Sequence, residues 1–119
     1  VRRFENLSAE QRERRRHQEW KKKYGLSPAD IEFMRQQQQN TCALCLRPGG
    51  ILVVDHCHAT EMLIGKRLSV RKLVHSRCNS GIGMLGESPE VLRRAADYIE
   101  REQARLQARV EEVLGKEAA

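Results

Sequence analysis

Two pairs of closely spaced cysteine and histidine residues constrain the fold of this 119-residue chain more than any other feature. Two residues separate Cys42 from Cys45 and His75 from Cys78, and 29 residues lie between the two pairs. Each spacing places two ligands on one tight turn, and two such turns together form the tetrahedral thiolate and imidazole site that zinc prefers. Since the chain has few aromatic residues for a core, we expect a bound zinc ion to supply much of its folding free energy.

The fourth zinc ligand has two candidates, His75 and Cys57. His75 is preferred because it keeps the two-residue spacing to Cys78, and Cys57 is then expected to be a small buried side chain. Two disulfide bonds are the alternative use of four cysteines, but histidines cluster with the cysteines and no secretion signal is visible. We therefore expect an intracellular, reducing environment in which the thiols remain available for a metal.

Positive charge is concentrated in the first part of the chain, which carries a net charge of +6 overall. Residues 1–24 carry nine Lys or Arg against four Glu, residues 25–86 seven against four acidic residues, and residues 87–119 six against eight. This balance favours a polyanionic partner, most often nucleic acid, although a solvated basic helix is the alternative. No stretch approaches the roughly 20 apolar residues of a membrane span, so no membrane partner is expected.

Helix starts are recognisable from their capping residues. Ser8 with Gln11 predicts a long polar helix over residues 9–23, and Ser27 with Asp30 predicts a second helix that ends near residues 36–40. The buried face of this second helix is expected to include Ile31, Met34 and Phe33.

Ser88 and Pro89 predict a third helix with an amphipathic stripe. The stripe consists of Leu92, Ala95, Ile99, Leu106, Val110 and Val113. It has two interpretations, which are packing on its own domain and pairing with a second copy of the chain in a homodimer.

A group of polar residues follows the first of two predicted strands, at residues 51–54 and 70–74. Asp55, His56 and His58 come directly after the first strand, and Asn79 follows the second cysteine pair. A regular strand cannot direct Asp55 and His56 to one point, so the strand must end or bulge there.

This group of residues is suited to phosphodiester hydrolysis. A carboxylate and an amide oxygen, from Asp55 and Asn79, can hold a hard divalent cation such as Mg²⁺ or Mn²⁺. The neutral imidazole of His56 can accept a proton from water, and His58 can support it or contact a phosphate.

Four segments of the sequence resemble the recombination endonuclease VII family of the HNH, or ββα-metal, nucleases. They are residues 24–27, 42–45, 54–60 and 77–83. The resemblance implies a zinc-stabilised hairpin and helix that hold one divalent ion and cleave branched or duplex DNA to 5′-phosphate and 3′-hydroxyl ends. It also implies Cys42, Cys45 and Cys78 as zinc ligands, Asp55 and Asn79 as divalent-ion ligands and His56 as general base.

Two features depart from the family pattern. His75 stands where the family usually has a third cysteine, which makes the zinc site less negative and more sensitive to acid. The connection over residues 61–69 is longer than usual, and it is expected either to lengthen the hairpin toward DNA or to displace the second strand.

Basic residues on two segments are predicted to bind DNA phosphates. They are Lys66, Arg67, Arg71, Lys72 and Arg77 near the polar group, and Arg15, Arg16 and Lys22 on the first helix.

The sequence thus predicts an α+β protein with a small zinc-stabilised ββα-metal core over residues 25–87. A basic helical arm over residues 1–24 and an amphipathic helix over residues 88–119 flank this core. The predicted function is a Mg²⁺-dependent DNA endonuclease. The alternatives are a non-catalytic zinc-ribbon DNA-binding module and a protein-interaction domain that uses the terminal helix.

Overall fold

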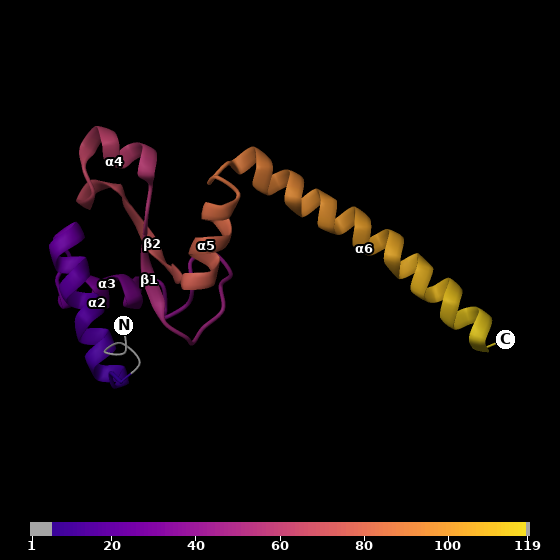
Figure 1. Ribbon diagram of the computed structural model, residues 1–119, viewed down its shortest axis with the longest axis horizontal. Helices are drawn as coiled ribbons and strands as arrows, with labels where there is room; N and C mark the ends of the chain where they lie inside the picture. Colours follow the sequence, from indigo (N-terminus) through magenta and orange to yellow (C-terminus); the bar gives the residue numbers. More distant parts are fainter. Residues whose placement is uncertain (1–5, 119) are drawn as a thin grey trace. The chain divides into compact units, whose positions relative to one another are not determined.

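The computed structural model describes residues 6–118, which form five α-helices, one short 3-10 helix and a two-stranded antiparallel sheet (Figure 1). The elements are α2 (Ala9–Tyr24), α3 (Pro28–Gln37), β1 (Leu52–His56), α4 (His58–Ile64), η1 (Arg67–Ser69), β2 (Val70–His75), α5 (Ser76–Met84) and α6 (Pro89–Ala118). The predicted α+β class is confirmed. The chain divides into two compact units, residues 1–79 and 80–119.

Both predicted capping boxes are present. The Ser8 hydroxyl accepts a hydrogen bond from the Gln11 N–H at 3.2 Å, and the Gln11 side chain accepts one from the Ser8 N–H at 2.9 Å. Ser27 and Asp30 make the same reciprocal pair before α3, and the hydrogen bonds from Ser27 lower the pKa of the Asp30 carboxyl. Gly25 ends α2 in the left-handed region at a φ of 69°, so the chain can turn directly into α3.

The core of the first unit lies where α2 and α3 pack against the hairpin. Its buried hydrophobic side chains are Trp20, Tyr24, Leu26, Ile31, Cys42, Leu52, Val54, Leu73 and Val74. Ile31 is fully buried and Met34 packs against the cluster, as predicted. The expectation for Phe33 is wrong, because this side chain is 61% exposed. Two residues beyond Ile31, it lies on nearly the opposite side of the helix.

The hairpin contains an irregularity at Asp55. Val54 pairs with Leu73 and His56 pairs with Val70, so one residue of β1 faces two residues of β2. This is the geometry of a β-bulge, which disrupts the ladder and increases the local twist. The first strand was predicted to end or bulge here, but β1 extends through Asp55 and His56, and the extra residue of the irregularity lies on β2. The exposed Ile51 lies outside β1.

A side-chain amide joins α3 to the sheet. Gln38 follows α3, and its Nε2 donates to the Leu73 carbonyl at 2.7 Å while its Oε1 accepts from the Leu73 N–H at 2.9 Å. The amide therefore satisfies the backbone of β2 on its free edge, as a neighbouring strand would.

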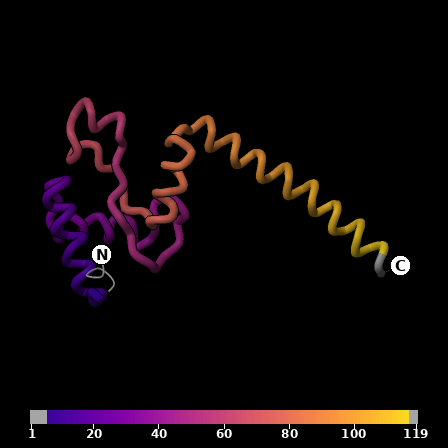
Figure 2. Tube along the Cα trace, in the orientation of Figure 1, coloured from indigo at the N-terminus to yellow at the C-terminus, as the bar shows by residue number. Residues whose placement is uncertain are grey.

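The long connection between the strands forms helical structure. Residues 58–64 form α4 and residues 67–69 form η1, and these two elements contact each other (Figure 2). The hairpin is therefore not lengthened, and β2 remains paired with β1, so both expectations for this segment are wrong. Met62, Leu63 and Leu68 on this connection are 89%, 84% and 71% exposed.

The second unit contains α6, which begins where the sequence predicted. The Ser88 hydroxyl caps it by accepting a hydrogen bond from the Val91 N–H at 3.2 Å. On the predicted stripe, Leu92 and Ala95 are half-buried, whereas the side chains of Ile99, Leu106, Val110 and Val113 are between 45% and 51% exposed. Among the described residues, no helix has the length and apolar character needed to cross a membrane.

The buried Leu73 should carry much of the stability of the first unit. We expect Leu73→Ala to lower the free energy of unfolding of the zinc-loaded protein by about 2–5 kcal/mol, because it leaves a cavity in the core. Leu63→Ala removes the same atoms from an 84% exposed position and should change the free energy of unfolding little. Chemical denaturation followed by circular dichroism measures both, and equal losses would contradict the described core.

Candidate active site and metal centre

Four predicted zinc ligands lie together in the first unit. One ligand atom from each of Cys42, Cys45, His75 and Cys78 lies within 4.8 Å of the others. The two cysteines of the first pair come from the loop after α3, His75 is the last residue of β2, and Cys78 lies in the first turn of α5. The cluster therefore joins two segments that are distant in the sequence, the loop after α3 and the junction of β2 with α5.

Hydrogen bonds fix the orientation of the His75 ring. Its Nδ1 lies 3.3 Å from the Cys45 Sγ, and its Nε2 lies 2.7 Å from the Gly49 carbonyl. Because a carbonyl only accepts, Nε2 carries the proton and Nδ1 keeps its lone pair toward the cysteine sulfurs. Of the two candidates for the fourth ligand, the structure thus places His75 in the cluster. The half-buried Cys57 Sγ instead accepts a hydrogen bond from the Thr60 hydroxyl at 3.0 Å.

The electrostatics of the cluster favour a bound cation. Burial raises the pKa of the Cys42 thiol, but backbone N–H groups of Cys45, His75 and Leu44 together outweigh this effect and lower the pKa. Hydrogen bonding from the Arg47 backbone likewise lowers the pKa of Cys45. Burial and the two neighbouring thiols raise the pKa of Cys78, because three thiolates cannot share so small a space without a balancing cation.

This donor set fits zinc. Three thiolates and one imidazole, held by N–H···S hydrogen bonds and a carbonyl-oriented histidine, match the ligands and outer contacts of closed structural zinc sites. With all four positions filled by protein, such an ion would stabilise the fold and take no part in chemistry.

The predicted reactive residues line one cavity of about 230 Å³ next to this cluster. Its lining residues are Glu19, Trp20, Lys23, Tyr24, Val53, Val54, Asp55, His56, His58 and Asn79. Asn79 directly follows the zinc-cluster residue Cys78, and Asp55 and His56 lie on β1 where the register shifts against β2. The cavity thus brings together the Asp55 carboxylate, the Asn79 amide and two imidazoles, which come from β1, α4 and α5.

Asp55 is buried and paired with Arg71 of β2. The Arg71 Nε lies 2.7 Å from one carboxylate oxygen and its terminal nitrogen 2.8 Å from the other, which is a bidentate pair across the bulge. Only 6% of Asp55 is exposed, so this pairing offsets the cost of burying the carboxylate. Each oxygen keeps a second lone pair for a cation.

His56 makes a contact at each of its ring nitrogens. Its Nδ1 lies 2.9 Å from the Tyr24 hydroxyl of α2, and its Nε2 lies 3.0 Å from a Glu61 carboxylate oxygen of α4. The ring of His58 lies 4.4 Å from the His56 ring, measured between centroids. The His56 side chain is only 12% exposed, so these contacts restrict it tightly.

The basic residues predicted to bind DNA have different surroundings. Arg67 donates to the Gly25 carbonyl, Arg71 pairs with Asp55, and Lys66 Nζ lies 4.0 Å from a Glu61 oxygen. Lys72, Arg77, Arg15 and Lys22 are exposed, whereas Arg16 is half-buried. Lys23, another basic residue of α2, lines the cavity.

Two residues of the site, Tyr24 and Glu61, were not predicted from the sequence. Tyr24 was noted only within a family motif, and Glu61 only as the start of the longer connection. A helix signal for this segment does exist, because a short apolar run ending at Ile64 is followed by Gly65. A helix beginning at His58 would have brought Glu61 back toward the strand end.

The family model for recombination endonuclease VII matches residues 17–101, which is well over half of the chain. The chain belongs to the recombination endonuclease VII family. No curated protein and no solved structure matched it. The match covers both cysteine pairs and all four predicted reactive residues. Family membership supports an enzyme that cleaves within nucleic-acid chains, with DNA as its substrate.

Removing single candidate ligands should separate the two choices for the fourth zinc position. We expect Cys57→Ala to bind one zinc ion per chain, as the wild type does, because its sulfur lies outside the cluster. His75→Ala should bind zinc about 10- to 100-fold more weakly or lose it, since one ligand is missing. Competition with a chromophoric chelator measures the affinity, and loss of zinc in Cys57→Ala alone would contradict the assignment.

Proposed function

We propose that this member of the recombination endonuclease VII family is an HNH-type DNA endonuclease that depends on a divalent cation. The observation that carries the proposal is the single cavity lined by Asp55, His56 and Asn79. A structural zinc module has no need of a carboxylate, an amide and an imidazole in one cavity, and phosphodiester hydrolysis uses all three.

Asp55 and Asn79 would hold the cation, Mg²⁺ or Mn²⁺, because carboxylate and amide oxygens are the ligands that such hard ions prefer. When bound, the ion would neutralise negative charge that develops on the phosphate. Arg71 keeps the Asp55 carboxylate in a fixed orientation.

His56 would act as the general base and take a proton from the attacking water. The water oxygen bonds to phosphorus as the bond from phosphorus to the 3′ oxygen breaks. The leaving oxygen takes up a proton from solvent, so the products carry a 5′-phosphate and a 3′-hydroxyl. The exposed His58, whose ring contacts His56, would contact the phosphate being cleaved.

DNA would approach across the basic residues around the cavity. Lys23 lines the cavity itself, and Lys72 and Arg77 are exposed on β2 and α5. Exposed cations of α2, such as Arg15 and Lys22, extend the positive surface along the helix that contributes Tyr24. We propose branched or duplex DNA as the substrate, bound mainly through its phosphates and therefore weakened by salt.

The competing function, a zinc-ribbon module that binds DNA without cutting it, uses the same zinc cluster and the same basic residues. The two functions differ only in the role of the cavity. For a module that binds DNA without cutting it, replacing His56 should have no effect on DNA cleavage. A comparison of DNA cleavage by the wild type and by His56→Ala therefore separates the two functions.

We expect the zinc-loaded wild type to nick or cut supercoiled plasmid and branched DNA in the presence of Mg²⁺ or Mn²⁺. His56→Ala should lower the cleavage rate by about 10²- to 10⁴-fold, because a positioned general base is lost. His17→Ala, which changes a histidine of α2 outside the cavity, is the matched control. Gel electrophoresis follows the products, and equal cutting by wild type and His56→Ala would contradict the assigned base.

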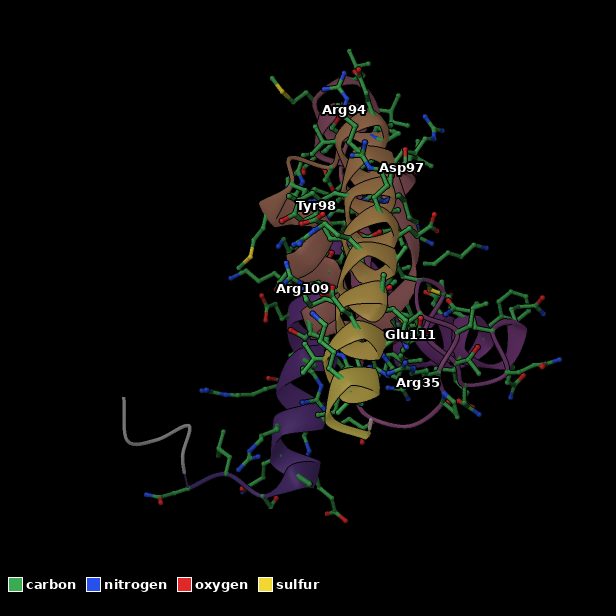
Figure 3. All side chains as sticks on the ribbon, turned by 90° about the vertical axis from the view of Figure 1, so that its right-hand side faces the viewer. Arg35, Arg94, Asp97, Tyr98, Arg109 and Glu111 are labelled. Carbon is green, nitrogen blue, oxygen red and sulfur yellow. The ribbon has the colours of Figure 1, made fainter. Side chains whose placement is uncertain are left out.

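We also propose that α6 pairs with α6 of a second copy. Leu92, Ile99, Leu106 and Val113 recur at intervals of seven residues, which is the spacing of a coiled-coil seam. In Figure 3, Tyr98 and Arg109 lie on one side of α6 and Asp97 and Glu111 on the other. Because one HNH site cuts one strand, a twofold dimer would supply the second site for paired incisions.

A charge on the seam should weaken this dimer. We expect Leu106→Asp to shift the protein toward the monomer, since it places a carboxylate on the apolar seam. Tyr98→Asp alters a 61% exposed side chain off the seam and should leave the dimer intact. Sedimentation equilibrium measures the association, and a monomeric wild type or equal effects of the two changes would overturn the proposed pairing.

A further inference from the structure

We propose that Glu61 is a positioning residue that fixes the tautomer of His56. In this role it holds the proton of His56 on Nε2, so that Nδ1 is the atom that accepts a proton. The inference rests on the proposed nuclease function for its catalytic consequence, but the tautomer itself can be measured without any cleavage. Glu61 lies on α4, in the connection that departs from the usual family pattern.

The two neighbours of His56 differ in what they can donate. A carboxylate only accepts hydrogen bonds, so the 3.0 Å contact between Glu61 and Nε2 requires a proton on Nε2. The Tyr24 hydroxyl can donate, and at 2.9 Å it does so to the lone pair of Nδ1 in the neutral ring. Both contacts are therefore satisfied by one tautomer only.

The position of the cavity agrees with this assignment. Tyr24, His56, Asp55 and Asn79 line the cavity, whereas Glu61 does not. His56 thus meets a cavity-lining residue, Tyr24, at Nδ1 and a residue outside the lining, Glu61, at Nε2. A water molecule that replaces the Tyr24 hydroxyl at Nδ1 would stand in the cavity where the proposed reaction occurs.

Glu61 is itself held in place by its helix. Its N–H donates to the Cys57 carbonyl at 3.0 Å, and its carbonyl accepts from the Gly65 N–H at 2.9 Å. One carboxylate oxygen contacts His56, while the other lies 4.0 Å from Lys66 Nζ. Only 23% of the Glu61 side chain is exposed, so the carboxylate is partly shielded from water where it meets the ring.

This arrangement gives Glu61 a defined role. When Nδ1 takes the proton from the attacking water, the ring becomes an imidazolium and the carboxylate lies next to the new positive charge. In this role Glu61 orients and stabilises the ring without accepting the proton itself. Glu61 thus contributes to the site through His56, although it is not itself among the residues that line the cavity.

Nitrogen-15 NMR of the zinc-loaded full chain without added divalent ions tests the tautomer directly. The His56 ring signals are those that disappear in His56→Gln. In the neutral ring of the wild type we expect the Nε2–H form, and Tyr24→Phe should preserve it because the Glu61 contact remains. Glu61→Ala should give a mixture of the two forms. An Nδ1–H form in the wild type, or no change in Glu61→Ala, would overturn the proposal.

Cleavage kinetics test the consequence for the reaction. Glu61→Ala should lower kcat by about 10- to 100-fold, the usual cost of losing a partner that orients a functional histidine, with little change in KM. Glu61→Gln, which keeps the shape and a possible hydrogen bond, should lose less. Glu32→Gln, on an exposed residue of α3 outside the cavity, is the matched control. A change confined to KM would contradict the positioning role.

The two experiments separate the two proposals. In one outcome the wild type does not cleave DNA but shows the Nε2–H form, and Glu61→Ala loses that form. This outcome contradicts the nuclease function and supports the assignment of Glu61 as the residue that fixes the tautomer. A wild type that cleaves, with kcat unchanged in Glu61→Ala and Glu61→Gln, supports the nuclease and overturns the role of Glu61. Zinc content and circular dichroism show whether each variant is folded.

Discussion

The convergence of four metal-ligand side chains is the constraint on which the rest of the first unit depends. Their ligand atoms lie within 4.8 Å of one another, although they come from a loop, the end of β2 and the start of α5. Cys42 belongs to the small hydrophobic core as well as to the cluster, and Cys45 and Cys78 pack against that core, so the cluster ties these segments to it. Because Asn79 follows Cys78 and the paired strand β1 carries Asp55, the cluster also determines where the cavity forms.

Charge inside the cavity is balanced by neighbours from the same hairpin and its connection. Arg71 offsets the buried carboxylate of Asp55 across the bulge, and Glu61 approaches the far edge of His56 from α4. A buried carboxylate without such a partner would be costly, and an imidazole without one would turn freely. Residues that looked like surface phosphate contacts or loop residues in the sequence therefore stabilise the site from within.

Local signals in the sequence predicted much of the fold. The capping residues Ser8 and Ser27 predicted two helix starts, and the cysteine pairs predicted the ligand cluster, because both depend on spacing along the chain. The partners of Arg71 and His56 depend on contacts between distant segments. The exposure of Phe33 instead follows from its position two residues beyond the buried Ile31, on nearly the opposite side of α3. The roles of Asp55, His56, His58 and Asn79 stay predictions, since only their shared cavity is observed.

Binding of Mn²⁺ to the zinc-loaded protein, followed by electron paramagnetic resonance, tests most directly whether the cavity is an ion site. The account predicts one Mn²⁺ per chain in the wild type, with binding weakened at least about 10-fold in both Asp55→Asn and Asn79→Ala. Both variants should keep their zinc, because neither residue belongs to the sulfur cluster. Equal Mn²⁺ binding by the wild type and these variants would contradict the central claim.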